Sequence, residues 1–153
     1  DAERTSEFAA IAKDYGKQSV FSRAIDVAPD WRAALDILIE SGITRVLTSG
    51  QRPTAMEGAD VIAAMVRYAA GRIEILPGSG IRANNLRLIL ERTGCTQLHM
   101  SAHMIAHDMS AANGNGICFT GSEIPKEGCY KLIDPNKVEE IARMLKGDAN
   151  VQL

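Results

Sequence analysis

The segment Arg72–Gly94 reads RIEILPGSGIRANNLRLILERTG and decides the fold that the sequence predicts. Its first part, Arg72–Pro77, is an apolar run too short for a helix and is followed by a glycine-rich turn, which is typical of a β-strand. From about Ala83 to Gly94, apolar residues return at helical spacing. The residues that this helix is expected to bury are Leu86, Ile89 and Leu90. The segment therefore predicts one strand–loop–helix unit.

The same unit repeats along the chain at intervals of roughly 24 to 29 residues from strand to strand. The expected strands are Gln18–Ile25, Ile43–Thr48, Arg72–Pro77 and Gln97–Ala102. Helix-capping signals stand between or after them, at Asp30, Thr54–Glu57 and Asp134–Pro135. A further helix, from about Arg4 to Tyr15, precedes the first strand.

Repeated β–loop–α units with right-handed crossovers give a parallel sheet with its helices outside. We therefore predict an α/β fold of the (β/α)8 TIM-barrel type, of which this chain supplies about the last four βα units as a half-barrel. A four-stranded doubly wound sheet is the alternative. A chain that begins with Asp rather than Met fits a partial product, with strands missing upstream. The prediction treats 1–153 as a single domain and 104–132 as an irregular loop or insertion.

The composition argues against several classes of partner. A formal net charge of −2 over 153 residues gives no electrostatic reason to expect nucleic acid or an anionic membrane. No apolar stretch approaches the roughly 20 residues of a membrane span, and the charged start DAERTSEF lacks the apolar region of a secretory signal. The three cysteines, Cys95, Cys118 and Cys129, are odd in number and far apart, which argues against a disulfide framework. The sequence therefore predicts a cytoplasmic protein.

In a barrel, ligands reach the side chains at the carboxyl ends of the strands and in the loops that follow. The candidate ligand- or anion-binding residues at this rim are Arg23, Asp26, Thr48, Ser49, Gly50, Gly78, Ser79, Gly80, Arg82 and Ser101. The glycine turn at 78–80 precedes a helix, so its N–H groups and Arg82 could hold a phosphate or carboxylate. The alternatives are structural: an Arg23–Asp26 ion pair, a capping loop at 48–50, and a tight turn that needs glycine.

Histidine and methionine crowd into residues 99–109, HMSAHMIAHDM. Imidazole and thioether suit copper, and the soft thioether favours Cu(I). The candidate metal ligands are His99, His103, Met104 and His107.

On an extended strand His99 and His103 would lie about 13 Å apart, whereas on a helix neighbouring histidines could bind one ion. We expect the strand, with His99 and Ser101 facing the barrel interior. A fold-back after Ser101 would let His103, Met104 and His107 meet at one Cu(I). The alternative is a strand with polar interior residues, followed by a loop, without a metal.

Four stretches near the ends of the expected strands resemble motifs of the CutC family. They are FSRAID at 21–26, RVLTSGQ at 45–51, GRIEILPGSGIR at 71–82 and HMSA at 99–102. The resemblance covers roughly residues 15 to 105 and implies a (β/α)8 barrel in which the expected strands are the fifth to the eighth. It also implies a cytosolic protein linked to copper tolerance or copper binding. Ser22 stands where the family commonly has histidine, and the amino-terminal half of the family fold is missing.

The leading functional prediction is a copper homeostasis protein of CutC type that binds Cu(I) in the cytoplasm. One alternative is a TIM-barrel enzyme that uses Arg23, Asp26, the glycine turn and His99 on a small phosphorylated or carboxylated metabolite. Another is a truncated, non-catalytic half-barrel. No residue is assigned a catalytic role, because no triad spacing, HExxH motif or paired CxxC motif occurs. The expected partners are a copper ion or a small anion, and the open sheet edges of a half-barrel predict a homo-oligomer.

Overall fold

The computed structural model describes residues 1–108, 110 and 129–146. The described chain divides into two compact units, Asp1–Met100 and a second that begins at Ser101. The sequence predicted a single domain over 1–153, whereas the division falls just after the last residues that pair with the parallel sheet. Within the described ranges no helix has both the length and the apolar character needed to cross a membrane.

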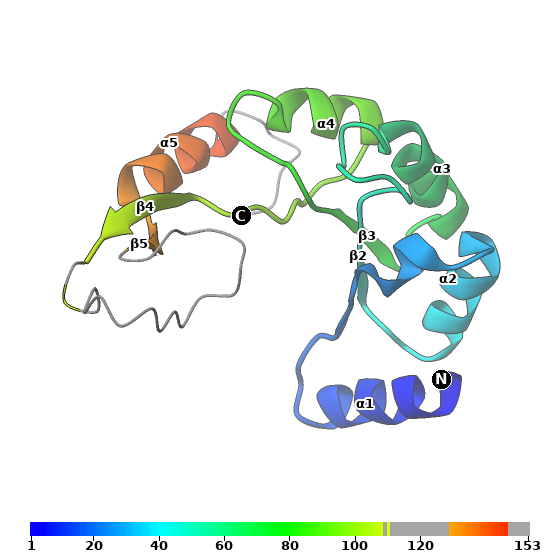
Figure 1. The fold of residues 1–153 in the computed structure, drawn as a ribbon. Helices are drawn as coiled ribbons and strands as arrows, with labels where there is room; N and C mark the ends of the chain where they lie inside the picture. Colours follow the sequence, from blue (N-terminus) through cyan, green and yellow to red (C-terminus); the bar gives the residue numbers. More distant parts are fainter. Residues whose placement is uncertain (109, 111–128, 147–153) are drawn as a thin grey trace. The chain divides into compact units, whose positions relative to one another are not determined.

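The first unit alternates helices with short strands. Its helices are α1 (Ala2–Asp14), α2 (Trp31–Glu40), α3 (Ala59–Ala69) and α4 (Leu86–Thr93), with a 3-10 helix, η1, at Arg23–Val27. Its strands are β1 (Val20–Phe21), β2 (Arg45–Thr48) and β3 (Glu74–Pro77). They pair in parallel in the order β1-β2-β3, and Figure 1 shows α2, α3 and α4 along one side of them. The predicted α/β fold with a parallel sheet is confirmed.

Alternation along β2 and β3 decides which side chains belong to the core. Val46, Thr48, Ile75 and Pro77 are buried, whereas the residues between them point the other way and stay partly exposed. The buried apolar residues that the helices contribute include Leu35, Leu38, Ile62, Met65, Leu86 and Ile89. Burying one side chain of this size contributes about 1.5 to 3 kcal/mol. The core on this one face therefore holds the helices on the sheet.

Two helices begin later than the sequence predicted. The Thr54–Glu57 pair forms, with Thr54 Oγ1 2.7 Å from Glu57 Oε1, but it closes a turn ahead of the helix, and α3 begins at Ala59. Similarly, α4 begins at Leu86 rather than near Ala83. The side chain of Asn85 holds the chain in a turn before α4, since its Nδ2 donates to the carbonyl of Gly80 at 3.0 Å.

The first predicted strand, Gln18–Ile25, is shortened to β1. Ser22 Oγ accepts a hydrogen bond from the N–H of Ala24 at 3.3 Å, and this cap turns the chain into η1. The prediction was wrong over 22–25 because a local side-chain hydrogen bond competes with strand pairing there.

The fourth predicted strand, Gln97–Ala102, is reduced to a single parallel bridge between Gly78 and His99. The N–H of His99 donates to the carbonyl of Pro77 at 2.8 Å, so this segment does lie next to β3 as expected. Gly78 permits the close approach, since a Cβ at this position would lie 2.7 Å from Leu47 Cδ1.

The second unit holds an antiparallel hairpin and one helix. β4 (His103–His107) pairs with β5 (Cys129–Ile133), and α5 spans Pro135–Lys146. This corrects the prediction of an irregular segment over 104–132, because a strand occupies each of its ends. Met109 and residues 111–128 lie outside the described residues. Asp134 caps α5 as predicted, its Oδ1 accepting from the N–H of Asn136 at 3.0 Å.

Candidate functional site

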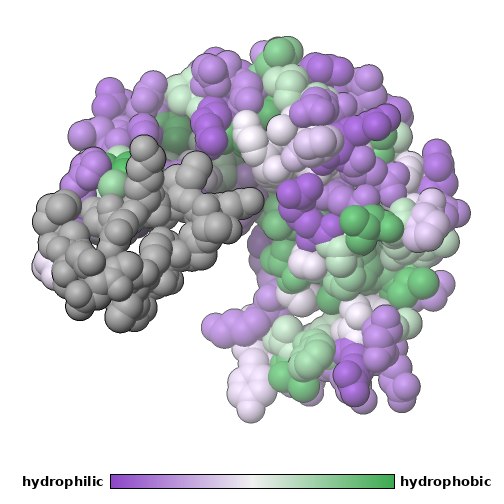
Figure 2. Space-filling view, viewed as in Figure 1, coloured by the Kyte–Doolittle hydropathy of each residue, from purple (hydrophilic) through white to green (hydrophobic). Residues whose placement is uncertain are grey.

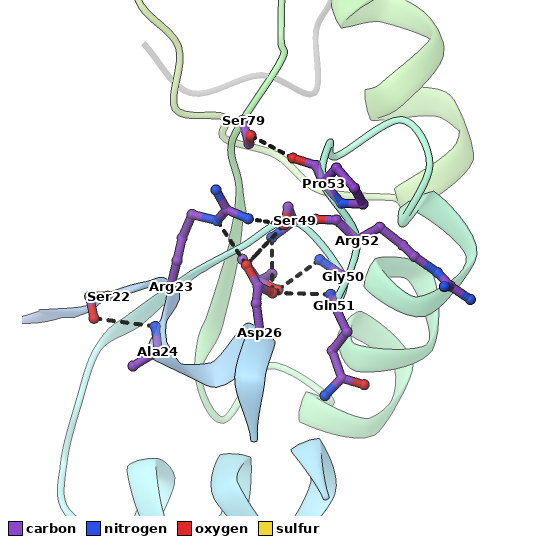
Figure 3. Close-up of polar contacts among 11 residues, drawn as sticks. Ser22, Arg23, Ala24, Asp26, Ser49, Gly50, Gln51, Arg52, Pro53 and Ser79 are labelled. Atoms are coloured by element: carbon purple, nitrogen blue, oxygen red, sulfur yellow. Dashed lines mark hydrogen bonds and ion pairs between the residues drawn. The ribbon is translucent and has the colours of Figure 1, made fainter. Parts of the chain in front are cut away.

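The carboxylate of Asp26 joins two elements at the carboxyl ends of β1 and β2. Asp26 lies in η1 and accepts hydrogen bonds from the last residue of β2 and from the loop that follows β2 (Figure 3). Its Oδ1 accepts from Thr48 Oγ1 at 2.5 Å and from the N–H of Gln51 at 3.1 Å. Its Oδ2 accepts from the N–H of Ser49 at 2.9 Å. The loop after β2 therefore takes its shape around one carboxylate.

Arg23 completes this network from the solvent side. Its Nε donates to Asp26 Oδ2 at 2.8 Å, and its Nη2 donates to Ser49 Oγ at 2.5 Å. The side chain of Asp26 is 7% exposed and that of Arg23 is 42% exposed. The Arg23–Asp26 ion pair, which the sequence suggested as a structural alternative, thus forms. Arg23 is the member of the network that a ligand could touch.

Thr48, Ser49 and Gly50 are buried and shape the loop from inside. Ser49 Oγ lies within hydrogen-bond distance of both Asp26 Oδ2 (2.9 Å) and the carbonyl of Arg52 (2.5 Å), and its single proton can serve only one of them at a time. Gly50 has a φ of 69° and lies against the backbone of Gly58, where a Cβ would overlap. These residues position the rim rather than present groups to a ligand.

Hydrogen bonding sets the charge state of Asp26. Burial alone would raise the pKa of this carboxyl, but the hydrogen bonds from Thr48, Arg23 and the N–H groups of Ser49 and Gln51 outweigh burial and hold the pKa below its ordinary value. Because folding lowers this pKa, the network contributes stability above the pKa of the unfolded chain and loses it as pH falls through the folded value. The network is therefore fully charged near neutral pH.

The glycine turn predicted as an anion cradle lies at the end of β3. Ser79 and Gly80 have φ values of 80° and 70°. The N–H groups of Ser79, Gly80 and Ile81 have no hydrogen-bond partner among the described residues, and within the same ranges the exposed guanidinium of Arg82 has no ion-pair partner. The turn thus keeps uncommitted donors close in sequence to a cation.

The predicted copper ligands fall in both units. His99 belongs to the first unit, and its side chain is exposed beside the glycine turn. Ser101, predicted as an anion-binding residue, is exposed and is the first residue of the second unit. His103 and His107 share one face of β4 because side chains alternate along a strand, and their Cα atoms lie about 13 Å apart at a rise of about 3.3 Å per residue. Met104 occupies the opposite face.

The fold-back that would join His103, Met104 and His107 is therefore absent, and these three side chains do not fit one ion. No cluster of three or more His, Cys, Asp or Glu side chains able to hold a metal occurs in the part of the chain that the structure describes. The proposed fold-back after Ser101 is therefore corrected, because His103–His107 forms an extended strand.

One pair that the sequence did not single out does converge. His107 Nδ1 lies 3.2 Å from Cys129 Sγ, and the two residues are direct partners in the β4–β5 register. They are 22 positions apart, so only the pairing of the strands brings them together. The available signal was the β-branched and aromatic content of CYKLI, which favours a strand beside the histidine-rich segment. Gln51, whose N–H binds Asp26, was missed in the same way.

Most of the chain matches known proteins. A family model described as the CutC family matches residues 1–104. The chain belongs to the CutC family. A family protein CutC from Treponema denticola is 44% identical over 145 residues, which cover 95% of this chain and 58% of that protein. The human copper homeostasis protein cutC homolog is 36% identical over 126 residues, which cover 82% of this chain and 46% of that protein.

The structural comparison agrees with the family. A solved CutC structure from Streptococcus agalactiae is similar to this CutC-family chain with a TM-score of 0.59 and 35% sequence identity, covering 65% of this chain and 48% of that one. The chain spans about half the length of the relatives that it matches. The resemblance inferred from the four rim motifs is confirmed.

Replacing Asp26 by Asn tests the rim network of this CutC-family chain. An amide cannot accept all of these hydrogen bonds or pair with Arg23, so we expect the free energy of unfolding to fall by about 2 to 4 kcal/mol at pH 7. The difference between parent and variant should shrink as pH falls through the lowered pKa of Asp26. Chemical denaturation across pH 3 to 7 measures both effects.

Asp60→Asn is the matched control. Asp60 also pairs with an arginine, Arg92, at 2.9 Å, but its side chain is 91% exposed, so its loss should change stability little. Equal effects of the two substitutions would show that the buried network does not hold the loop.

Proposed function

We propose that this chain is the carboxy-terminal half of a (β/α)8 barrel that acts in copper homeostasis and binds Cu(I) in the cytoplasm. Membership of the CutC family supports this, together with the human and mouse relatives, each named as a copper homeostasis protein cutC homolog. The single observation that carries Cu(I) is the combination of imidazole and thiol on the β4–β5 hairpin, which are ligands that soft copper accepts.

The half-barrel proposal rests on the sheet face away from the helices. On that face Arg45 and Glu74 form an ion pair of 2.9 Å, and Leu47 and Leu76 are only partly exposed. In a closed barrel this face lines the interior, which layers of side chains fill. The coverage of about half of each relative supports the same proposal.

Cu(I) binding can be measured by competition with a colorimetric chelator under anaerobic, reducing conditions. We expect the parent chain to take Cu(I) from the chelator and to ignore Mg²⁺ and Ca²⁺, which prefer oxygen ligands. A Cys95→Ser/Cys118→Ser/Cys129→Ser variant should lose most of this affinity. A His103→Ala/Met104→Leu variant should retain it, because these two side chains lie on opposite faces of β4. A parent chain that takes no Cu(I) from the chelator would contradict the proposed function.

We also propose that the chain associates with a second half-barrel. For the purified chain, this partner is a second copy of the same chain. Three large apolar side chains on α1 and at its carboxyl-terminal cap, spaced for one helical face, are exposed: Phe8 at 70%, Ile11 at 54% and Tyr15 at 78%. Figure 2 shows apolar surface on this segment, at the bottom of the view. The sheet edge at β1 is also open, with Val20 51% exposed. Such surfaces favour association.

Sedimentation at low micromolar concentration tests this association. We expect a dimer or larger species for the parent, and a shift towards monomer for Phe8→Glu/Ile11→Glu. Ile37→Glu is the control, because Ile37 is an exposed apolar residue of α2 at 45%. A sharp monomer that unfolds cooperatively would instead favour a self-contained doubly wound domain.

A second candidate function is recognition of a small phosphorylated or carboxylated metabolite at the rim. The observation that favours it is the set of uncommitted N–H groups at residues 79–81 beside Arg82. Consecutive N–H groups in a turn form a concave site for anions. Arg23 adds a second, partly exposed guanidinium at the strand ends.

Phosphate should then raise the melting temperature of the parent, because a ligand that binds only the native state stabilises it. Arg82→Ala should remove most of that increase, whereas Arg67→Ala, at an exposed position on α3, should keep it. Equal stabilisation of parent and Arg82→Ala by phosphate would indicate a general salt effect.

A further inference from the structure

The contact between His107 and Cys129 is built by the backbone of the hairpin. Five residue pairs register β4 against β5, from His103 with Ile133 to His107 with Cys129. Side chains of directly opposed residues in an antiparallel pair lie on the same face, with Cβ atoms about 4.5 to 5.5 Å apart. The strand pairing therefore places an imidazole nitrogen and a sulfur side by side, 3.2 Å apart.

A metal ion would fit between these atoms with little movement. Bonds of about 2.3 Å to sulfur and about 2.0 Å to nitrogen place two ligand atoms about 3.5 Å apart in tetrahedral geometry and about 3.7 Å apart in trigonal geometry. The side chain of His107 is exposed and that of Cys129 is half-buried. Both can therefore adjust by a few tenths of an ångström without disturbing a core.

Three other potential donors, Cys95, His103 and Met104, are less suited to this role. Burial raises the pKa of the Cys95 thiol to about 11, so this cysteine stays protonated near neutral pH and makes a poor metal ligand. Met104 projects from the opposite face of β4, and His103 faces Ile133 across the hairpin instead of a second donor.

Two charged residues lie near the pair, Lys131 on β5 and Asp108, which follows His107 in the chain. Lys131 lies on the same face, two residues along β5 from Cys129. Its positive charge repels a divalent cation more strongly than it repels Cu(I). Zn²⁺ also generally requires four ligands, whereas Cu(I) forms stable complexes with two or three soft donors.

We propose that His107 Nδ1 and Cys129 Sγ are the Cu(I) ligands of this chain, an assignment that rests on the copper function proposed above. Binding forms one Cu–S and one Cu–N bond, and the thiol proton passes to solvent without any change in oxidation state. With two donors from the described part of the chain and an exposed histidine, the ion keeps an open position where a thiol of another molecule could attach. The site therefore suits the exchange of copper with a partner thiol rather than its storage.

Single substitutions test the assignment on the full chain. We expect His107→Ala and Cys129→Ser each to weaken Cu(I) binding at least about tenfold in chelator competition. The double variant should bind Cu(I) only slightly less tightly than the single variant with the lower affinity, because the effects of removing two ligands of one ion are strongly coupled. X-ray absorption of the parent should show mixed nitrogen and sulfur donors, and the near-ultraviolet thiolate–Cu(I) band should disappear in Cys129→Ser.

His103→Ala is the matched control, since it removes an imidazole from the same face of β4 with no thiol opposite. Cys95→Ala and Cys118→Ser test the remaining thiols, and circular dichroism confirms the fold of every variant.

Cu(I) bound equally well by parent, His107→Ala and Cys129→Ser would overturn the assignment and leave the copper function standing with other ligands. A parent that binds no Cu(I) would overturn both proposals. Retained sulfur-only coordination in His107→Ala, at unchanged affinity, would also reject the histidine as a ligand.

Discussion

The charge on Asp26 is the constraint on which the rim of the first unit depends. A buried carboxylate costs several kcal/mol unless it is paired and hydrogen-bonded. Here Arg23, Thr48, Ser49 and Gln51 supply the donors, and they come from both η1 and the loop after β2. If the loop after β2 moved away from η1, Asp26 would keep Arg23 but lose the hydrogen bonds from Thr48, Ser49 and Gln51. The ends of β1 and β2 are therefore fixed together by electrostatics, while the apolar core fixes the helices to one face of the strands.

Local signals predicted much of the first unit. The cap at Asp30 forms, with its Oδ1 2.8 Å from the N–H of Arg32, and β2 and β3 lie within the predicted runs. These features depend on neighbouring residues, which a sequence pattern reports directly. The errors arise where a side chain overrides the pattern. Ser22 ends β1 early, and Asn85 delays α4. Hydrogen bonds of this kind compete with regular backbone pairing and leave no periodic trace in the sequence.

The sequence predicted where the rim residues lie along the strands but not how their side chains are oriented. The three-residue spacing of Arg23 and Asp26 indicated their ion pair, and the loop at 48–50 was placed correctly at the strand ends. The sequence could not reveal that Thr48 and Ser49 turn inward to the carboxylate, because that depends on contacts between residues more than 20 positions apart. The hairpin was missed for the same reason. Its two strands are at least 22 positions apart in sequence, and the His107–Cys129 pair exists only once they are in register.

Two candidate binding sites among the described residues, the N–H groups at 79–81 with Arg82 and the His107–Cys129 pair, differ in how strongly water competes with their ligands. The N–H groups at 79–81 and the exposed Arg82 must exchange hydrogen bonds with water for hydrogen bonds with an anion, and each exchange yields only about 0.5 to 1.5 kcal/mol. A metal bound directly by thiolate and imidazole gains much more, since structural zinc sites in short peptides are worth about 10 to 16 kcal/mol near pH 7. A site with two protein ligands gains less binding free energy than a complete site, but its metal–ligand bonds are not simply exchanged for hydrogen bonds to water. Exposure to water therefore lowers the affinity of the anion site far more than that of the His107–Cys129 pair. This difference favours copper binding on the hairpin, with the rim network serving chiefly to hold the strand ends in place.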